Sequence, residues 1–149
     1  MQPKAEVSTT NVMRNDEIYT IEDIYALPDG ERAELIDGKI YYMAPPSRIH
    51  QKISWKLHQT IANYIDGQSG KCEVYAAPFA VFLNEDDINY VEPDISVICD
   101  LSKLDDKGCH GAPDWIIEIT SPSSRSMDYF KKLLNIVRLV SGNIGSLIP

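Results

Sequence analysis

Two short apolar runs decide the fold: YVEPDISVI at residues 90–98 and PDWIIEITSPS at residues 113–123. Both are rich in β-branched and aromatic residues and are bounded by Pro, Gly, Asp and Ser, so they predict two strands. Because each run is short and continuous, we expect strands covered on both faces, as in the centre of an α/β sheet. Residues 99–112 between them are polar and predict a loop that contains a helical turn.

Each predicted strand carries one carboxylate, Asp94 in the first and Glu118 in the second. Glu118 lies between Ile117 and Ile119, and an isolated buried carboxylate must become neutral or be compensated by a cation. A divalent metal shared with Asp94 would compensate it, since hard oxygen ligands suit Mg²⁺ or Mn²⁺. The alternative is a small α/β binding domain in which the two acids complete buried hydrogen-bond networks.

Turn and capping residues predict the elements before these strands. Thr20, with an acid three residues later, predicts the start of a short helix. The pair Asp37-Gly38 predicts a hairpin of strands 33–36 and 39–43. Residues 73–83 predict one strand, in which Pro78 implies a sheet edge or a bulge because proline donates no ladder hydrogen bond.

A long helix is predicted after Ser47, which can cap its N-terminus. Its apolar residues recur every four positions, and we expect this stripe to be core: Ile49, Ile53, Leu57, Ile61 and Ile65. His50 lies in the first turn beside the stripe, where it either points toward a site or is an ordinary surface or hydrogen-bonded histidine. The acidic residues 84–87 are read as a solvated turn rather than a metal site.

Length and composition predict one domain over residues 18–149, preceded by a disordered or loosely ordered arm at 1–17. The chain has 149 residues, 44% of them apolar, and no apolar run near the ~18 residues that cross a membrane. The arm lacks the apolar segment of a signal peptide, so we expect a cytoplasmic protein without membrane contact. We therefore expect Cys72, Cys99 and Cys109 to be reduced thiols.

The net charge of −8 argues against a general nucleic-acid binder, which usually presents a basic surface to phosphates. It does not exclude a nuclease, because metal ligands are acidic and a local basic groove can coexist with an acidic exterior. Charge alone therefore leaves a nuclease open.

An ordered set of motifs resembles the Uma-type restriction endonuclease family of the PD-(D/E)xK nuclease superfamily. The resemblance runs from about Tyr19 to Lys132, and the matching segments are ELIDG at 34–38, Met43, Pro46-Ser47 leading to His50, EPD at 92–94, and 113–123. It implies an α/β restriction-endonuclease-like core, with a mixed central sheet flanked by helices. It also implies metal-dependent hydrolysis of DNA phosphodiester bonds, DNA as partner, and a homodimer.

The resemblance also implies a set of site residues. Asp94, Glu118 and the main-chain carbonyl of Ile119 would hold Mg²⁺ or Mn²⁺, and His50 would lie near the carboxylates. Glu34 would face the metal site, although the residues alone leave it equally open as a solvated acid on an edge strand. All five residues are therefore predicted to act at one site.

The catalytic lysine is the least regular part of the pattern. The superfamily usually places it two residues after the second acid, on the same strand face, and this position is Thr120. The Uma-type pattern places it on the following helix, where Asp128 and Lys132 match the expected spacing. Lys131 is the neighbouring candidate, but consecutive helical residues point about 100° apart, so one of the two faces the site.

After Lys132 the resemblance stops, and residues 133–149 are atypical for the family. Shifted-frame back-translation of residues 141–149 can restore an aromatic segment of the family type. We therefore hypothesise that a frameshift replaced and truncated the C-terminus, which sequencing of the gene would test. The atypical C-terminus, Thr120 and the acidic charge keep open a catalytically inactive relative that acts, if at all, as a binding module.

Overall fold

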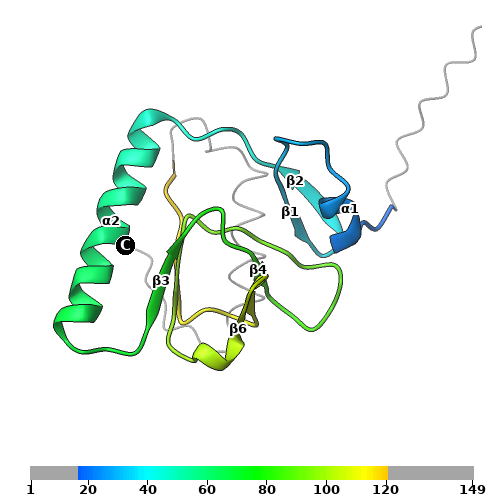
Figure 1. Ribbon diagram of the computed structural model, residues 1–149. Coiled ribbons are helices and arrows are strands. Elements are labelled where there is room, and N and C mark those ends of the chain that lie inside the picture. The colour runs from blue at the N-terminus through cyan, green and yellow to red at the C-terminus, as the bar shows by residue number, and fades with distance from the viewer. Residues whose placement is uncertain (1–16, 121–149) are drawn as a thin grey trace, which may run out of the picture.

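The computed structural model describes residues 17–120 (Figure 1). The predicted arm at 1–17, apart from its last residue, lies outside this range, as do Lys131, Lys132 and residues 133–149. The elements in chain order are α1 (Ile21–Tyr25), β1 (Ala33–Ile36), β2 (Lys39–Tyr42), α2 (Arg48–Gly67), β3 (Glu73–Ala76), β4 (Val81–Phe82), β5 (Ile95–Ile98), a 3₁₀ turn (Leu101–Lys103), β6 (Leu104–Asp105), β7 (Gly108–His110) and β8 (Trp115–Ile117). The fold is thus mixed α/β.

The strands form three small sheets, with the orders β1-β2, β3-β5-β8 and β4-β7-β6. β4 and β7 are parallel, and the other strand pairs are antiparallel. Single bridges from Leu35 to Tyr90 and from Val81 to Val91 connect β1 and β4 to the chain just before β5. Over residues 17–120 the strands therefore form several small sheets, whereas the sequence predicted one mixed central sheet.

The strand predicted at 73–83 is wrong as a single element. It divides at Ala77-Pro78 into β3 and β4, which belong to different sheets. The physical reason is the one that made Pro78 suspect, because proline has no N–H with which to continue a ladder. β3 pairs only with β5 among the described strands, as an edge strand does.

The locally coded elements are confirmed. The Asp23 carboxylate accepts the Thr20 N–H at 2.7 Å and starts α1. Asp37 and Gly38 both have positive φ, 49° and 73°, as a two-residue hairpin turn requires, and they join β1 to β2. The polar loop at 99–112 contains the expected helical turn and also a hairpin, β6–β7, that the sequence did not predict.

β5 and β8 are the two strands that decide the fold. β5 lies between β3 and β8, and all four of its residues are buried, as expected for a strand covered on both faces. β8 differs, because Trp115 is exposed and the other two residues are half-buried. The expectation of two covered faces is therefore wrong for β8, which pairs on one side alone among the described strands.

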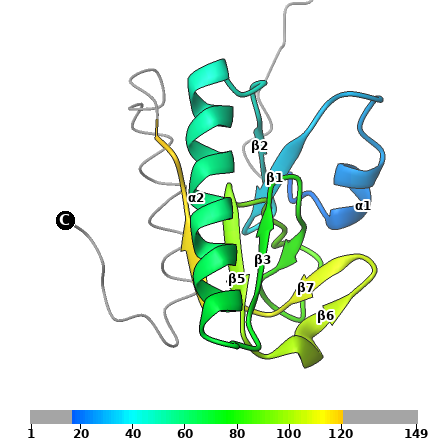
Figure 2. The ribbon, with the colours of Figure 1, turned by 60° about the vertical axis from the view of Figure 1, so that its left-hand side comes forward.

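Helix α2 begins as predicted, with Ser47 Oγ accepting the His50 N–H at 3.1 Å. It lies beside β3 (Figure 2), and a 3.1 Å contact joins His58 Nε2 to the carbonyl of Val74 on that strand. The expectation that the whole apolar stripe is core is wrong, since Ile49 and Ile53 are exposed. The rest of the stripe is half-buried. Among the described strands, α2 makes its main contact with β3, and this edge strand covers only part of the helix face.

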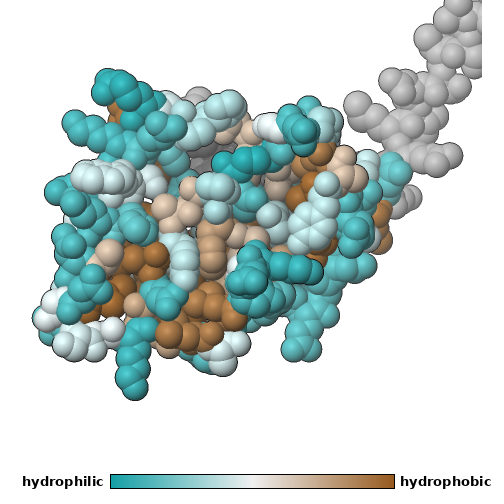
Figure 3. Space-filling view, viewed as in Figure 1, coloured by the Kyte–Doolittle hydropathy of each residue, from teal (hydrophilic) through white to brown (hydrophobic). Residues whose placement is uncertain are grey.

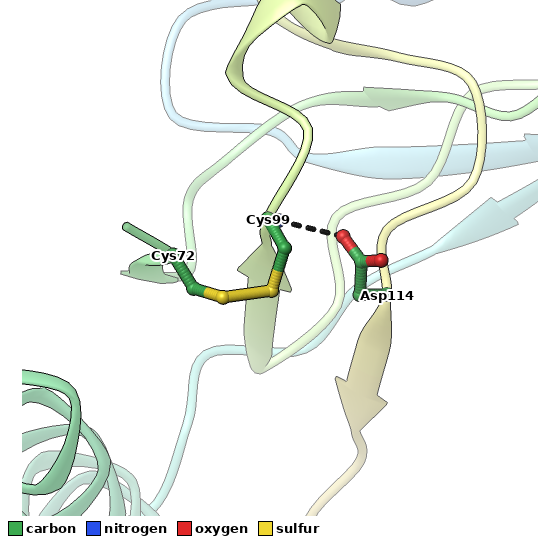
Figure 4. The surroundings of a disulfide bond; sticks show 3 residues. All are labelled: Cys72, Cys99 and Asp114. Carbon is green, nitrogen blue, oxygen red and sulfur yellow. Dashed lines mark hydrogen bonds between the residues drawn. A yellow bond between two sulfur atoms is a disulfide. The ribbon is translucent and has the colours of Figure 1, made fainter. Parts of the chain in front are cut away.

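The cysteine prediction is wrong for two of the three residues. Cys72 and Cys99 form a disulfide (Figure 4), while Cys109 is free and buried, which raises the pKa of its thiol. Glu73 pairs with Ile98 across β3 and β5, so the next cross-strand positions are Cys72 and Cys99. This neighbourhood depends on strand register, which the sequence spacing does not reveal.

The core consists of two buried clusters. One packs around Ile36, Val81, Val91 and Ile98, and the other around Leu35, Phe82 and Tyr90. Apolar side chains also reach the surface in the lower part of the face in Figure 3, within a hydrophilic border. No helix in residues 17–120 is long and apolar enough to span a bilayer.

Candidate functional site

The register of β5 and β8 brings Asp94 and Glu118 to neighbouring positions. Ile95 pairs with Ile117, so the next position on each chain is Asp94, just before β5, and Glu118, just after β8. The Ile119 N–H donates to Asp94 Oδ2 at 2.6 Å, which extends the contact beyond the last ladder pair. Asp94 is 13% exposed, and Glu118 is half-buried. Two carboxylates distant in sequence therefore lie at one end of the β3-β5-β8 sheet.

His50 adds a third element to this end of the sheet. It lies in the first turn of α2, and its Nε2 is 3.0 Å from Asp94 Oδ1. The His50 side chain is 22% exposed, so it is shielded but open to one side. Each oxygen of Asp94 thus has a nitrogen partner, His50 for Oδ1 and Ile119 for Oδ2. The structure places His50 against Asp94 and not at an unrelated surface position.

Glu34 is fully buried on β1, which excludes its reading as a solvated acid on an edge strand. Its Oε1 accepts the main-chain N–H of Glu92 at 2.9 Å. Glu92 precedes Asp94 by two residues, so Glu34 contacts the segment that carries the central carboxylate. Tyr90, on the same segment, pairs its main chain with Leu35, the residue after Glu34.

Thr120 occupies the usual lysine position and is exposed. The two lysine candidates on the predicted following helix lie outside the described residues. The basic group of the proposed site therefore stays a sequence prediction.

The carboxylates present the oxygen donors that a hard divalent cation prefers. Within residues 17–120, no three histidine, cysteine, aspartate or glutamate side chains are arranged to hold a metal ion together. Asp94, Glu118 and the Ile119 carbonyl provide two carboxylates and one main-chain oxygen. This small set fits Mg²⁺, which is commonly held by one or two carboxylates and completed by water and phosphate oxygens.

The other two histidines and the acidic turn have local roles. His58 binds the β3 main chain, and His110 pairs with Asp105. Asp86, in the acidic turn, accepts the Ile88 N–H and the Asn89 side-chain amide, as a turn residue does. A cavity of about 320 Å³ lies between Tyr75, Phe79 and the β6–β7 turn, and none of the predicted site residues lines it.

The sequence reasoning missed the partners of Glu92. Its carboxylate accepts the Tyr90 hydroxyl at 2.8 Å and the Arg32 Nε–H at 2.8 Å. An acid inside an apolar run was the signal that drew attention to Glu118, and the same signal was available for Glu92. Arg32 lies far away in sequence, so only the fold could identify it as the partner.

Comparison with known proteins gives a family for the chain. The model of the Uma2 family, described as "Putative restriction endonuclease", matches residues 21–135. The protein named "Uncharacterized protein slr1290" of Synechocystis sp. is 33% identical over 98 residues, 66% of this chain. The chain spans 50% of the length of that relative.

A solved structure also resembles the fold. The crystal structure of a putative nuclease belonging to DUF820 from Anabaena variabilis has a TM-score of 0.59 and 24% sequence identity. The match covers 80% of this chain and 68% of that one, and at this identity it supports the fold alone. The family model, in contrast, covers more than half of the chain in sequence, and the chain therefore belongs to the Uma2 family, described as "Putative restriction endonuclease".

Proposed function

We propose that the chain is a metal-dependent endonuclease that hydrolyses DNA phosphodiester bonds, built on a restriction-endonuclease-like core. The observation that carries the proposal is the convergence of Asp94, Glu118 and His50 at one end of the β3-β5-β8 sheet. Family membership supports nuclease chemistry, and two carboxylates side by side fit a Mg²⁺ or Mn²⁺ ion.

Each residue has a proposed part in the reaction. Asp94, Glu118 and the Ile119 carbonyl would hold the ion, which would supply Lewis-acid polarisation of the scissile phosphate and activation of a water. His50 Nε2 fixes the orientation of the Asp94 carboxylate. Glu34 supports the same segment from β1, and Lys132, with Lys131 as the alternative, supplies the positive charge that faces the phosphate. A homodimer would allow both DNA strands to be cut.

A catalytically inactive relative is the second candidate. It is favoured by Thr120 at the usual lysine position and by the formal charge of −8, which opposes binding to DNA. A third candidate, a small binding domain, is favoured by the two nitrogen partners of Asp94, which satisfy this carboxylate without a metal.

Cleavage of supercoiled plasmid in Mg²⁺ or Mn²⁺ tests the proposal, with the chain compared to its Glu118→Gln variant. We expect metal-dependent cleavage that falls about a hundredfold or more in Glu118→Gln, because the amide cannot replace the charge of a metal ligand. Glu85→Gln, in the exposed acidic turn, is the matched control and should cleave normally.

A parallel calorimetric titration with Mn²⁺ separates the candidates. The inactive relative would be identified if the unaltered chain binds Mn²⁺ but does not cleave DNA, and if Glu118→Gln abolishes the binding. If the chain shows no Mn²⁺ binding and no cleavage, the result identifies the small binding domain.

A further inference from the structure

The Glu92 carboxylate is compensated on both of its oxygens, although it is not among the predicted site residues. Its side chain is 11% exposed. Arg32 Nε donates to Oε2 at 2.8 Å, and the Arg32 Nη2 contacts the same oxygen. The Tyr90 hydroxyl donates to Oε1 at 2.8 Å. Three donors from two side chains thus hold this carboxylate in one orientation.

Such a network is costly to build and sensitive to the loss of any member. A carboxylate taken out of water needs charge-assisted hydrogen bonds to offset its lost solvation. Burial, and after it the hydrogen bond to Glu92, raises the pKa of Tyr90 above its ordinary value, so the hydroxyl keeps its proton and remains a donor. Arg32 supplies a guanidinium that stays charged at any working pH.

The main chain of Glu92 links this network to the proposed site. Its N–H is the donor to Glu34 Oε1 at 2.9 Å. Two residues later, Asp94 contacts His50 at 3.0 Å and Ile119 at 2.6 Å. The short segment from Glu92 to Asp94 therefore holds Glu34 through its main chain and carries the Asp94 side chain.

Pro93 makes the link between Glu92 and Asp94 stiff. It is fully buried, its ring fixes its own φ, and it restricts the residue before it to extended conformations. An orientation imposed on Glu92 is therefore transmitted to Asp94 with little freedom between them.

We propose that Arg32, Tyr90 and Glu92 are positioning residues that fix the Glu34 and Asp94 carboxylates relative to each other. The effect of this positioning on a reaction rests on the proposed nuclease function. None of the three is among the proposed ligands of the ion, and each acts through the 92–94 segment. They would keep Asp94 in the orientation that the proposed cation site at the end of the β3-β5-β8 sheet requires.

Hydrogen exchange of individual amides in the full-length chain tests the positioning without requiring cleavage. The variants are Tyr90→Phe, which removes one hydroxyl, and Glu92→Gln, which keeps the shape and removes the charge. We expect the Glu92 and Ile119 amides to exchange about tenfold faster in both, as for the loss of a hydrogen bond to a charged group. The matched control is Asp105→Asn in the exposed His110 pair, which should leave both amides unchanged.

Mn²⁺ affinity and plasmid cleavage supply the functional readout. We expect Glu92→Gln to weaken Mn²⁺ binding about tenfold, because Asp94 loses the support of an oriented 92–94 segment, and Arg32→Lys to weaken it less because it keeps the charge. Unchanged exchange of the two amides in Glu92→Gln and Tyr90→Phe would overturn the positioning role. A chain that neither binds Mn²⁺ nor cuts DNA would overturn the nuclease proposal, while the exchange experiment would still decide the positioning.

Discussion

The two ends of β5 are held in place by different kinds of interaction. At its start, Asp94 accepts a hydrogen bond from the Ile119 N–H, after β8, and contacts His50 Nε2, on α2, at 3.0 Å. At its end, Cys99 is joined covalently to Cys72, and its N–H donates to Asp114 at 2.6 Å (Figure 4). Both ends use an ionisable side chain, but only the disulfide end also has a covalent bond.

The difference separates an end of β5 that contributes mainly to stability from an end that contributes to the proposed ligand site. A covalent bridge constrains the unfolded chain and places no charge in the sheet. The noncovalent contacts at Asp94 are reversible, so a cation or a substrate can rearrange them. We therefore expect changes at the disulfide end to alter stability, and changes at the Asp94 end to alter ligand binding.

The largest expected effect comes from removing the disulfide. The double variant Cys72→Ser, Cys99→Ser opens a link between residues 27 positions apart. Loop-closure entropy for this separation predicts a loss of about 3.5 kcal/mol in the free energy of unfolding. Urea unfolding of the oxidised chain and the double variant measures it.

Two controls sharpen the disulfide experiment. A reductant should destabilise the unaltered chain and have no effect on the double variant. The Ile119 amide, at the opposite end of the sheet, should exchange at the same rate in both proteins under conditions where both are folded. Equal unfolding free energies with and without reductant would contradict the stabilising role of the bridge.

A smaller effect is expected at the other end of β5, from His50→Ala. His50 contacts a predicted metal ligand, and loss of such a supporting contact commonly weakens metal affinity by about ten- to a hundredfold. We expect a weaker Mn²⁺ affinity by calorimetry. His110→Ala removes a second His–Asp pair, which is about half exposed and lies away from the site, and should leave the affinity unchanged. If His50→Ala and His110→Ala have similar Mn²⁺ affinities, the Asp94 end of β5 has no special part in metal binding.

The features predicted correctly from the residues are those fixed by near neighbours. The cap at Thr20, the Asp37-Gly38 turn and the Ser47 cap each depend on contacts within a few residues. The sequence also identified the strand runs that contain Asp94 and Glu118. Their approach was expected from the cost of burying Glu118 and from the resemblance, and the antiparallel register of β5 and β8 supplies the geometry.

The features that the sequence did not predict depend on contacts between distant segments. The disulfide requires β3 and β5 in one particular register, and the bond from Arg32 to Glu92 spans 60 residues. The stripe on α2 was assigned to the core on periodicity alone, but how much of a stripe is covered depends on the sheet it meets. In each case the sequence shows the residue itself but does not show which distant residue it contacts.

The smallest expected effect is a pH dependence at the disulfide end. Asp100, the residue after Cys99, accepts hydrogen bonds from Ser102 Oγ at 2.6 Å and from Ser102 N–H at 3.1 Å. These bonds, the side-chain one first, hold the pKa of Asp100 below its ordinary value of 3.8. A carboxyl whose pKa is lowered by folding contributes stability above its unfolded value, and this contribution disappears as the pH falls through the folded-state value.

Ser102→Ala removes the hydroxyl donor, so we expect the pKa of Asp100 to rise toward 3.8 in an NMR titration. Wild type should be slightly more stable than the variant near neutral pH, and the part of this difference due to Asp100 should vanish once the carboxyl is protonated in both proteins. Thr60→Ala, which removes a hydroxyl bonded within α2, should leave the titration of Asp100 unchanged. A titration curve identical in wild type and Ser102→Ala would show that the main-chain N–H alone fixes this carboxylate. In that case the disulfide end would hold its polar groups by backbone contacts, in contrast to the side-chain contact of His50 at Asp94.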